Sequence, residues 1–113
     1  MTTNWKAELQ IEFDRAETAR AANNEGQMRV CARRAAGIAI REYLTRRGIK
    51  PPSVSAYELL KYLGDQPDTP VDLRQATVHL TLRVTEEFRL PVNVDLVAEA
   101  KKICSTLLPE WDD

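Results

Sequence analysis

Apolar residues recur along the chain at spacings of three and four, which is the period of an amphipathic helix. The first such stripe consists of Trp5, Leu9, Phe13, Ala16 and Ala19 or Arg20. It predicts a first helix over residues 4–22, and the polar residues 23–26 are typical of a helix stop and turn. Clean alternation of apolar and polar residues, which marks a half-buried strand, is absent. We therefore expect an all-α fold.

A second helix is predicted over residues 27–47, ending at Gly48. Its apolar positions occupy more than one stripe and include many alanines: Met28, Cys31, Ala32, Ala35, Ala36, Ile38, Ala39, Ile40, Tyr43 and Leu44. Such a helix has neighbours on several sides, and small side chains let those neighbours approach closely. We expect it to be the central helix.

A short third helix follows an extended connector over residues 49–53, because Pro51 disfavours a helical conformation at Lys50. The residues from Ser55 to Glu58 have the form of a capping box, in which the serine and the glutamate each bind a backbone amide. The helix should stop at Gly64.

The fourth and fifth helices come after a proline-punctuated loop. The fourth is expected over residues 71–88, with a core stripe of Leu73, Ala76, Leu80, Val84 and Phe88. Asn93 is expected to cap the fifth, which Pro109 ends. Residues 1–113 then form one domain with a core over about 4–108 and an acidic tail over 109–113. The short connections favour an antiparallel up-and-down four-helix bundle with one additional short helix.

Composition narrows the class of protein without naming a function. The 113 residues suit one domain, and no apolar run is long enough to span a bilayer. We find no signal-peptide pattern, and Cys31 and Cys104 suit buried thiols of a cytoplasmic protein, so no membrane contact, metal or cofactor is expected. The net charge of −1 conceals a segment, residues 27–50, with seven basic residues and one acidic residue.

Catalytic chemistry has one candidate position, because His79 is the only histidine and Arg74 precedes it by five residues. A histidine can move a proton near neutral pH, and an arginine can hold a phosphate. At about 100° per residue the two side chains diverge by roughly 140° on one helix. Val78 and Leu82 fall between them on the solvent side, which predicts that this face is covered by another helix or by a second copy of the chain.

The chain resembles the HEPN domain family of small helical-bundle proteins over about residues 8–108. The stretches that carry the resemblance are residues 13–19, 24–26 leading into 31–40, 44–48, 55–60, and 80–91 leading into 96–103. The resemblance implies an Arg-x4–6-His site for metal-independent RNA cleavage in some members, usually across a homodimer cleft. Other members bind nucleotides or act beside a small nucleotidyltransferase, sometimes as toxin and antitoxin.

Two functions therefore stay open. In the first, Arg74 and His79 cleave RNA in a prokaryotic toxin–antitoxin or defence system, with Val78 and Leu82 at a dimer interface. In the second, the chain is a non-catalytic homodimeric module for a nucleotide or a partner nucleotidyltransferase. Arginines of the second helix would then bind phosphate, since guanidinium geometry suits phosphate oxygens; the candidates are Arg33, Arg34 and Arg41.

Overall fold

The computed structural model describes residues 4–82 and 95–112, and all regular structure within these ranges is helical. The elements are α1 (Trp5–Ala21), α2 (Glu25–Arg46), α3 (Ala56–Asp65), α4 (Val71–Thr81), α5 (Leu96–Leu107) and the 3-10 turn η1 (Pro109–Asp112). The expected all-α class is confirmed for the part of the chain that is described. No helix in that part is both long and apolar enough to cross a membrane.

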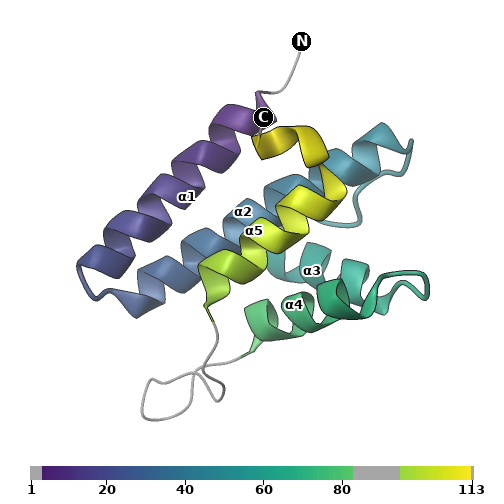
Figure 1. Cartoon of the computed structure of the whole chain (residues 1–113). Helices are drawn as coiled ribbons and strands as arrows, with labels where there is room; N and C mark the ends of the chain where they lie inside the picture. The colour runs from purple at the N-terminus through teal and green to yellow at the C-terminus, as the bar shows by residue number, and fades with distance from the viewer. Residues whose placement is uncertain (1–3, 83–94, 113) are drawn as a thin grey trace.

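α2 is the central helix, as its several apolar stripes predict. It packs against α1 on one side, against α5 on another and against α3 on a third, while α3 and α4 pack together as a hairpin. In Figure 1, α1, α2 and α5 run along one diagonal, and the α3–α4 hairpin lies below them. The apolar side chains that these helices turn inward form one core.

Small residues set the distance between α2 and its neighbours. The four alanines Ala32, Ala35, Ala36 and Ala39 have no exposed surface. A Cβ added at Gly37 would lie 2.9 Å from the Cβ of Ala56, which is closer than carbon atoms approach without strain. Glycine at this position therefore lets α3 cross directly against α2.

Gly64 has the same role between α3 and α4, which corrects its predicted role as a helix stop. A Cβ added there would lie 2.6 Å from the Oγ1 of Thr77 on α4. Gly64 is still helical, and α3 ends one residue later, at Asp65. The glycine is explained by helix packing rather than by a turn.

The turn between α1 and α2 is tighter than the sequence predicts, because Asn24 serves both helices. Asn23 adopts a left-handed conformation (φ 59°). The amides of Asn23 and Asn24 donate to the carbonyls of Arg20 and Ala19, which closes α1. The side chain of Asn24 then accepts from the amide of Gln27, so α2 begins at Glu25.

The start of α3 has half of the predicted capping box. Ser55 accepts a hydrogen bond from the amide of Glu58, as expected. The amide of Ser55 donates to the hydroxyl of Ser53 rather than to the Glu58 carboxylate. Serine therefore caps the helix without help from the glutamate.

α4 is shorter than expected, since it ends at Thr81 and Leu82 has an extended backbone. The side chain of Arg33 on α2 donates to the carbonyls of Leu80 and Leu82. A cation that binds the last carbonyls stabilises a helix end, so a residue from another helix fixes this boundary. Of the predicted core stripe, Leu73, Ala76 and Leu80 are buried, and positions 84 and 88 lie outside the described residues.

α5 begins two residues later than an Asn93 cap would require. The carboxylate of Asp95 accepts from the amides of Val97 and Ala98, at 3.1 and 3.2 Å, and is the N-cap. Asp95 also pairs with Arg20 at the end of α1 (2.8 Å). Position 93, the expected cap, lies outside the described residues, and Asp95 caps the helix as the structure has it.

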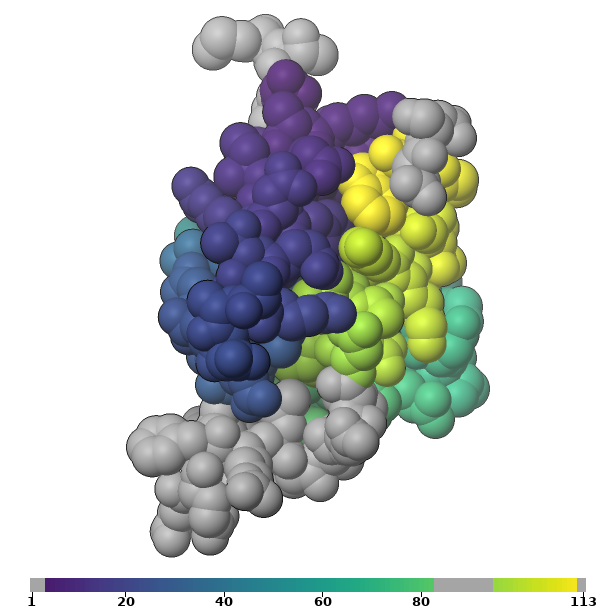
Figure 2. Space-filling view, turned by 60° about the vertical axis from the view of Figure 1, so that its left-hand side comes forward, coloured from purple at the N-terminus to yellow at the C-terminus, as the bar shows by residue number. Residues whose placement is uncertain are grey.

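The tail after α5 packs against α1. The ring of Trp111 lies 5.1 Å from that of Phe13, and Glu110 pairs with Arg46. Figure 2 shows the yellow C-terminal residues beside the purple start of α1. The segment that the sequence separates from the core as an acidic tail thus covers one end of it.

Candidate functional site

Arg74 lies on α4, and its side chain is used by the loop that joins α3 to α4. One guanidinium nitrogen, Nη2, donates to the carbonyl oxygens of Gln66 (3.1 Å), Thr69 (3.2 Å) and Pro67 (3.5 Å). Backbone carbonyls at a helix end need donors, and Arg74 supplies one. In this conformation the arginine stabilises the loop.

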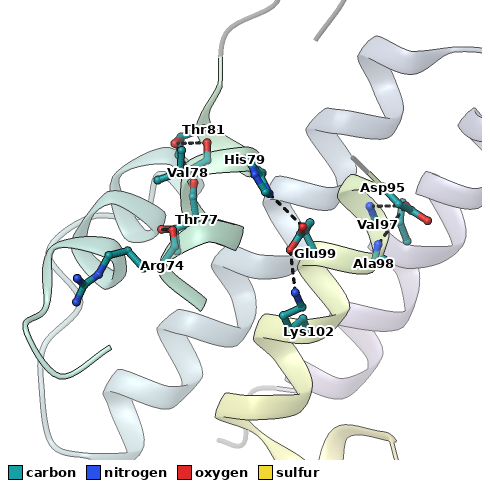
Figure 3. Close-up of polar contacts among 10 residues, drawn as sticks. All are labelled: Arg74, Thr77, Val78, His79, Thr81, Asp95, Val97, Ala98, Glu99 and Lys102. Atoms are coloured by element: carbon teal, nitrogen blue, oxygen red, sulfur yellow. Dashed lines mark hydrogen bonds and ion pairs between the residues drawn. The ribbon is translucent and has the colours of Figure 1, made fainter. Parts of the chain in front are cut away.

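His79 points the other way, toward α5. Its Nδ1 lies 3.1 Å from Oε1 of Glu99, and Oε2 of Glu99 lies 3.5 Å from the ammonium of Lys102 (Figure 3). The side chains of His79 and Glu99 are 25% and 15% exposed. The carboxylate thus orients the imidazole and joins α4 to α5.

One chain does not bring Arg74 and His79 together. Figure 3 shows the two side chains leaving opposite sides of α4, which confirms the divergence expected from their five-residue offset. Val78 between them is 52% exposed, so neighbouring helices leave much of it open. Leu82 is half-buried and follows the helix with an extended backbone, so it does not continue the helical face on which the sequence places it.

The three arginines predicted to bind phosphate line one cleft of about 470 Å³. Its floor is α2, which contributes Arg33, Arg34 and Arg41. One wall is α1, with Glu8 and Glu12, and the other is residues 54–57 at the start of α3. The sequence grouped these arginines by their guanidinium chemistry and their place on one helix, and all three line the same cleft.

The three arginines differ in how they are held. Arg33 donates to the end of α4, and burial, together with the nearby charge of Arg29, lowers its pKa. Arg41 pairs with Glu8 at 3.4 Å. Arg34 is exposed and has no ion pair or hydrogen bond with any residue in 4–82 or 95–112. Arg34 is therefore the arginine best placed to take a ligand.

The start of α3 adds a second source of positive potential. Ser55 accepts from Glu58, and the amides of Ala56 and Tyr57, which are among the free donors of a helix start, have no hydrogen-bond acceptor within the described residues. The helix dipole also favours an anion there. Tyr57 lies at the cleft and is partly exposed, so an aromatic ring stands beside these amides.

Acidic residues are the part of the site that sequence reasoning missed. Glu8 and Glu12 stand one turn apart on α1 and face the arginines of α2. Oε1 of Glu12 is buried and has no hydrogen-bond partner within the described residues. The sequence shows these two carboxylates beside the apolar stripe of α1. It does not show that they face the arginines of α2, because that depends on how the two helices pack.

The cysteines are inert in this structure. Cys31 and Cys104 are buried in the core, and burial raises the pKa of Cys104 to about 12. A thiol with such a pKa is neither a nucleophile nor a metal ligand near neutral pH. No cluster of histidine, cysteine and acidic residues suited to a metal ion occurs in residues 4–82 and 95–112.

Comparison of the chain with protein-family models, with curated proteins and with solved structures finds no match in any of the three.

Proposed function

We propose that this chain is a non-catalytic binding module, HEPN-like in its helical bundle, that binds the phosphate of a nucleotide in the cleft over α2. One observation supports this function best: the three arginines that the sequence offers for phosphate binding lie around a single cleft beside the start of α3. Guanidinium groups and helix-start amides are both favourable partners for phosphate oxygens. The cleft volume suits a small-molecule ligand.

Binding is favoured over catalysis because the candidate catalytic pair is separated. Arg74 is held by loop carbonyls and His79 by Glu99, on opposite sides of α4. A general base and a phosphate-binding arginine must reach the same phosphodiester to cleave it. The cleft, in contrast, needs no rearrangement of the chain to admit an anion.

Calorimetric titration tests the binding function. The full chain is titrated at low salt with inorganic phosphate and, separately, with a mononucleotide. We expect saturable binding that weakens as salt is added, because the contact is largely between charges. Arg34→Glu should weaken it at least about tenfold, since a repulsive carboxylate replaces the available cation. Arg47→Glu is the matched control, because Arg47 caps the far end of α2 outside the cleft. Equal losses in both variants would refute a cleft site.

RNA cleavage is the second candidate function, and one observation favours it. His79 is partly exposed and is oriented by a carboxylate, which is how a general base is commonly held. A homodimer formed through the exposed Val78 would bring Arg74 of a second copy near this histidine. If the chain instead binds a partner nucleotidyltransferase, that partner would use the same exposed surface around Val78.

Cleavage and dimerisation have separate tests. Structured RNA is incubated with the protein in chelator, and His79→Ala is compared with the parent. Chelator-resistant cleavage that the variant loses would support the enzyme, whereas an inactive parent would exclude it. The solution mass of the parent protein and of Val78→Glu shows whether a dimer forms through this face. A monomeric parent would exclude a catalytic site built from Arg74 of one copy and His79 of another.

A further inference from the structure

Glu12 distinguishes the cleft from a simple phosphate site. Its side chain is 13% exposed, and its Oε2 forms a long ion pair with Arg15 (3.7 Å), beyond hydrogen-bond distance. Oε1 is buried and has no hydrogen-bond partner among the described residues. A buried acceptor without a donor is unfavourable, so a ligand that brings a donor to Glu12 gains stability.

Glu8, the other carboxylate of the same wall, is already occupied. It pairs with Arg41 at 3.4 Å, and its side chain is 44% exposed. Of the two acids, Glu12 therefore has the acceptor that lacks a hydrogen-bond donor among the described residues. Oε1 is closed to solvent in this structure, so it meets a ligand only after the Glu12 side chain rotates toward the cleft, and the broad last torsion of a glutamate side chain allows this with α1 in place.

A carboxylate selects among nucleobases by the donors that they present. It is an acceptor only, and its two oxygens can receive two parallel N–H bonds. Guanine has two adjacent donors, the ring N1–H and the 2-amino group. Adenine and cytosine place a ring acceptor beside their amino group, and uracil has carbonyl oxygens on both sides of its N–H. The acceptors of these three bases would face the carboxylate and be repelled.

The length and surface of the cleft suit a mononucleotide. Arg34 and Arg41 are seven residues apart on α2, or about 10 Å along the helix, and share one face. Ile38 lies between them, is half-buried, and lines the floor with an apolar surface. A base can thus lie on Ile38 while its edge meets Glu12 on the α1 wall, and its phosphate can reach Arg34 and the start of α3.

We infer that the ligand of this cleft is a guanine nucleotide, with the base edge on Glu12 and the phosphate on Arg34 and the first amides of α3. This inference rests on the proposed phosphate-binding function and adds the identity of the base. It assigns Glu12 as the residue that determines specificity and Arg34 as the residue that supplies affinity.

Calorimetric titration of the parent with GMP, IMP, AMP and inorganic phosphate tests the inference. A two-bond base contact discriminates by about tenfold or more, so GMP should bind at least that much tighter than AMP. IMP, which lacks the 2-amino group, should be weaker than GMP in the unaltered protein. Glu12→Gln should abolish the preference for GMP over AMP without weakening the binding of inorganic phosphate, because the change removes the paired acceptors together with a negative charge that repels phosphate.

Glu8→Gln is the matched control, because it neutralises a carboxylate on the same wall that already has a partner. It should keep the preference for GMP. Equal binding of GMP, IMP and AMP would overturn the guanine inference while leaving the phosphate site intact. Failure of all four ligands to bind would instead overturn the proposed function itself, so the two failures are distinguishable.

Discussion

Replacing Gly37 by alanine should push α3 away from α2. The new Cβ would lie 2.9 Å from the Cβ and 3.1 Å from the Cα of Ala56, whereas carbon atoms pack best at about 3.5–4.0 Å. Backbone must therefore shift by roughly half an ångström or more, and overpacking of this kind costs about 1–3 kcal/mol. The higher helix propensity of alanine offsets up to about 1 kcal/mol of this loss in unfolding free energy. We expect a net loss of about 1 kcal/mol in unfolding free energy.

A double-mutant cycle isolates the clash from helix propensity. Ala56→Gly removes the atom that the new methyl group meets, so Gly37→Ala combined with Ala56→Gly should be more stable than the two single changes predict. The coupling should recover part of the overpacking energy of about 1–3 kcal/mol, because Ala56→Gly removes the Cβ at 2.9 Å and keeps the Cα at 3.1 Å. Equilibrium urea unfolding followed by circular dichroism measures all four proteins, and linear extrapolation gives the free energies.

Gly26→Ala is the matched control. Gly26 lies in the exposed first turn of α2, and the nearest atom to an added Cβ is 3.6 Å away, an ordinary contact. This change should stabilise the protein by up to about 1 kcal/mol through propensity alone. If Gly37→Ala were as stabilising as Gly26→Ala, or if Ala56→Gly gave no coupling, the close crossing of α2 and α3 would be wrong.

Three further predictions concern the termini of helices and the core. Arg33→Met keeps the length of the side chain but leaves the carbonyls at the end of α4 without their donor, so unfolding free energy should fall by about 1–3 kcal/mol in urea titrations. Asp95→Ala should cost about 1 kcal/mol in the same assay, whereas Asp95→Asn, which can still cap α5, should cost only a few tenths. Burial raises the pKa of Cys104 from 9.0 to about 12, so above pH 9 the unfolded thiol loses a proton that the folded one keeps. Unfolding free energy should then fall by up to about 1.4 kcal/mol per pH unit between 9 and 12, and a Cys104→Ala variant measured over the same range should lack this component.

The fold was predictable where the pattern is local. Alanine-rich stripes on several faces identify α2 as the central helix, and the left-handed residues Asn23 and Gly48 end α1 and α2 where the sequence places the stops. The end of α4 was not predictable, because it depends on Arg33, which comes from another helix and lies 47 positions away from Leu80. Tertiary contacts override local propensity at such boundaries.

The candidate sites also divide into features that follow from one helix, which were predictable, and features that depend on packing between elements, which were not. Basic charge on one predicted helix, with guanidinium geometry that suits phosphate, selected three arginines that share one cleft, because residues on one helix keep a fixed relation. The contribution of Glu12 depends on how α1 is placed beside α2, and the ties of Arg74 depend on the path of the α3–α4 loop. Spacing in sequence predicted the divergence of Arg74 and His79 but not the carboxylate of Glu99 that orients the histidine.

The glycine contact between α2 and α3 also has a consequence for recognition. Gly37 and Ala56 both line the cleft, and they meet through atoms that have no rotamers to choose from. The position of the α3 wall against the floor of the cleft is therefore fixed by backbone, and this part of the site is preorganised before any ligand arrives. Little conformational entropy remains to be lost on binding along this seam, so the cleft should discriminate among ligands by shape as well as by charge.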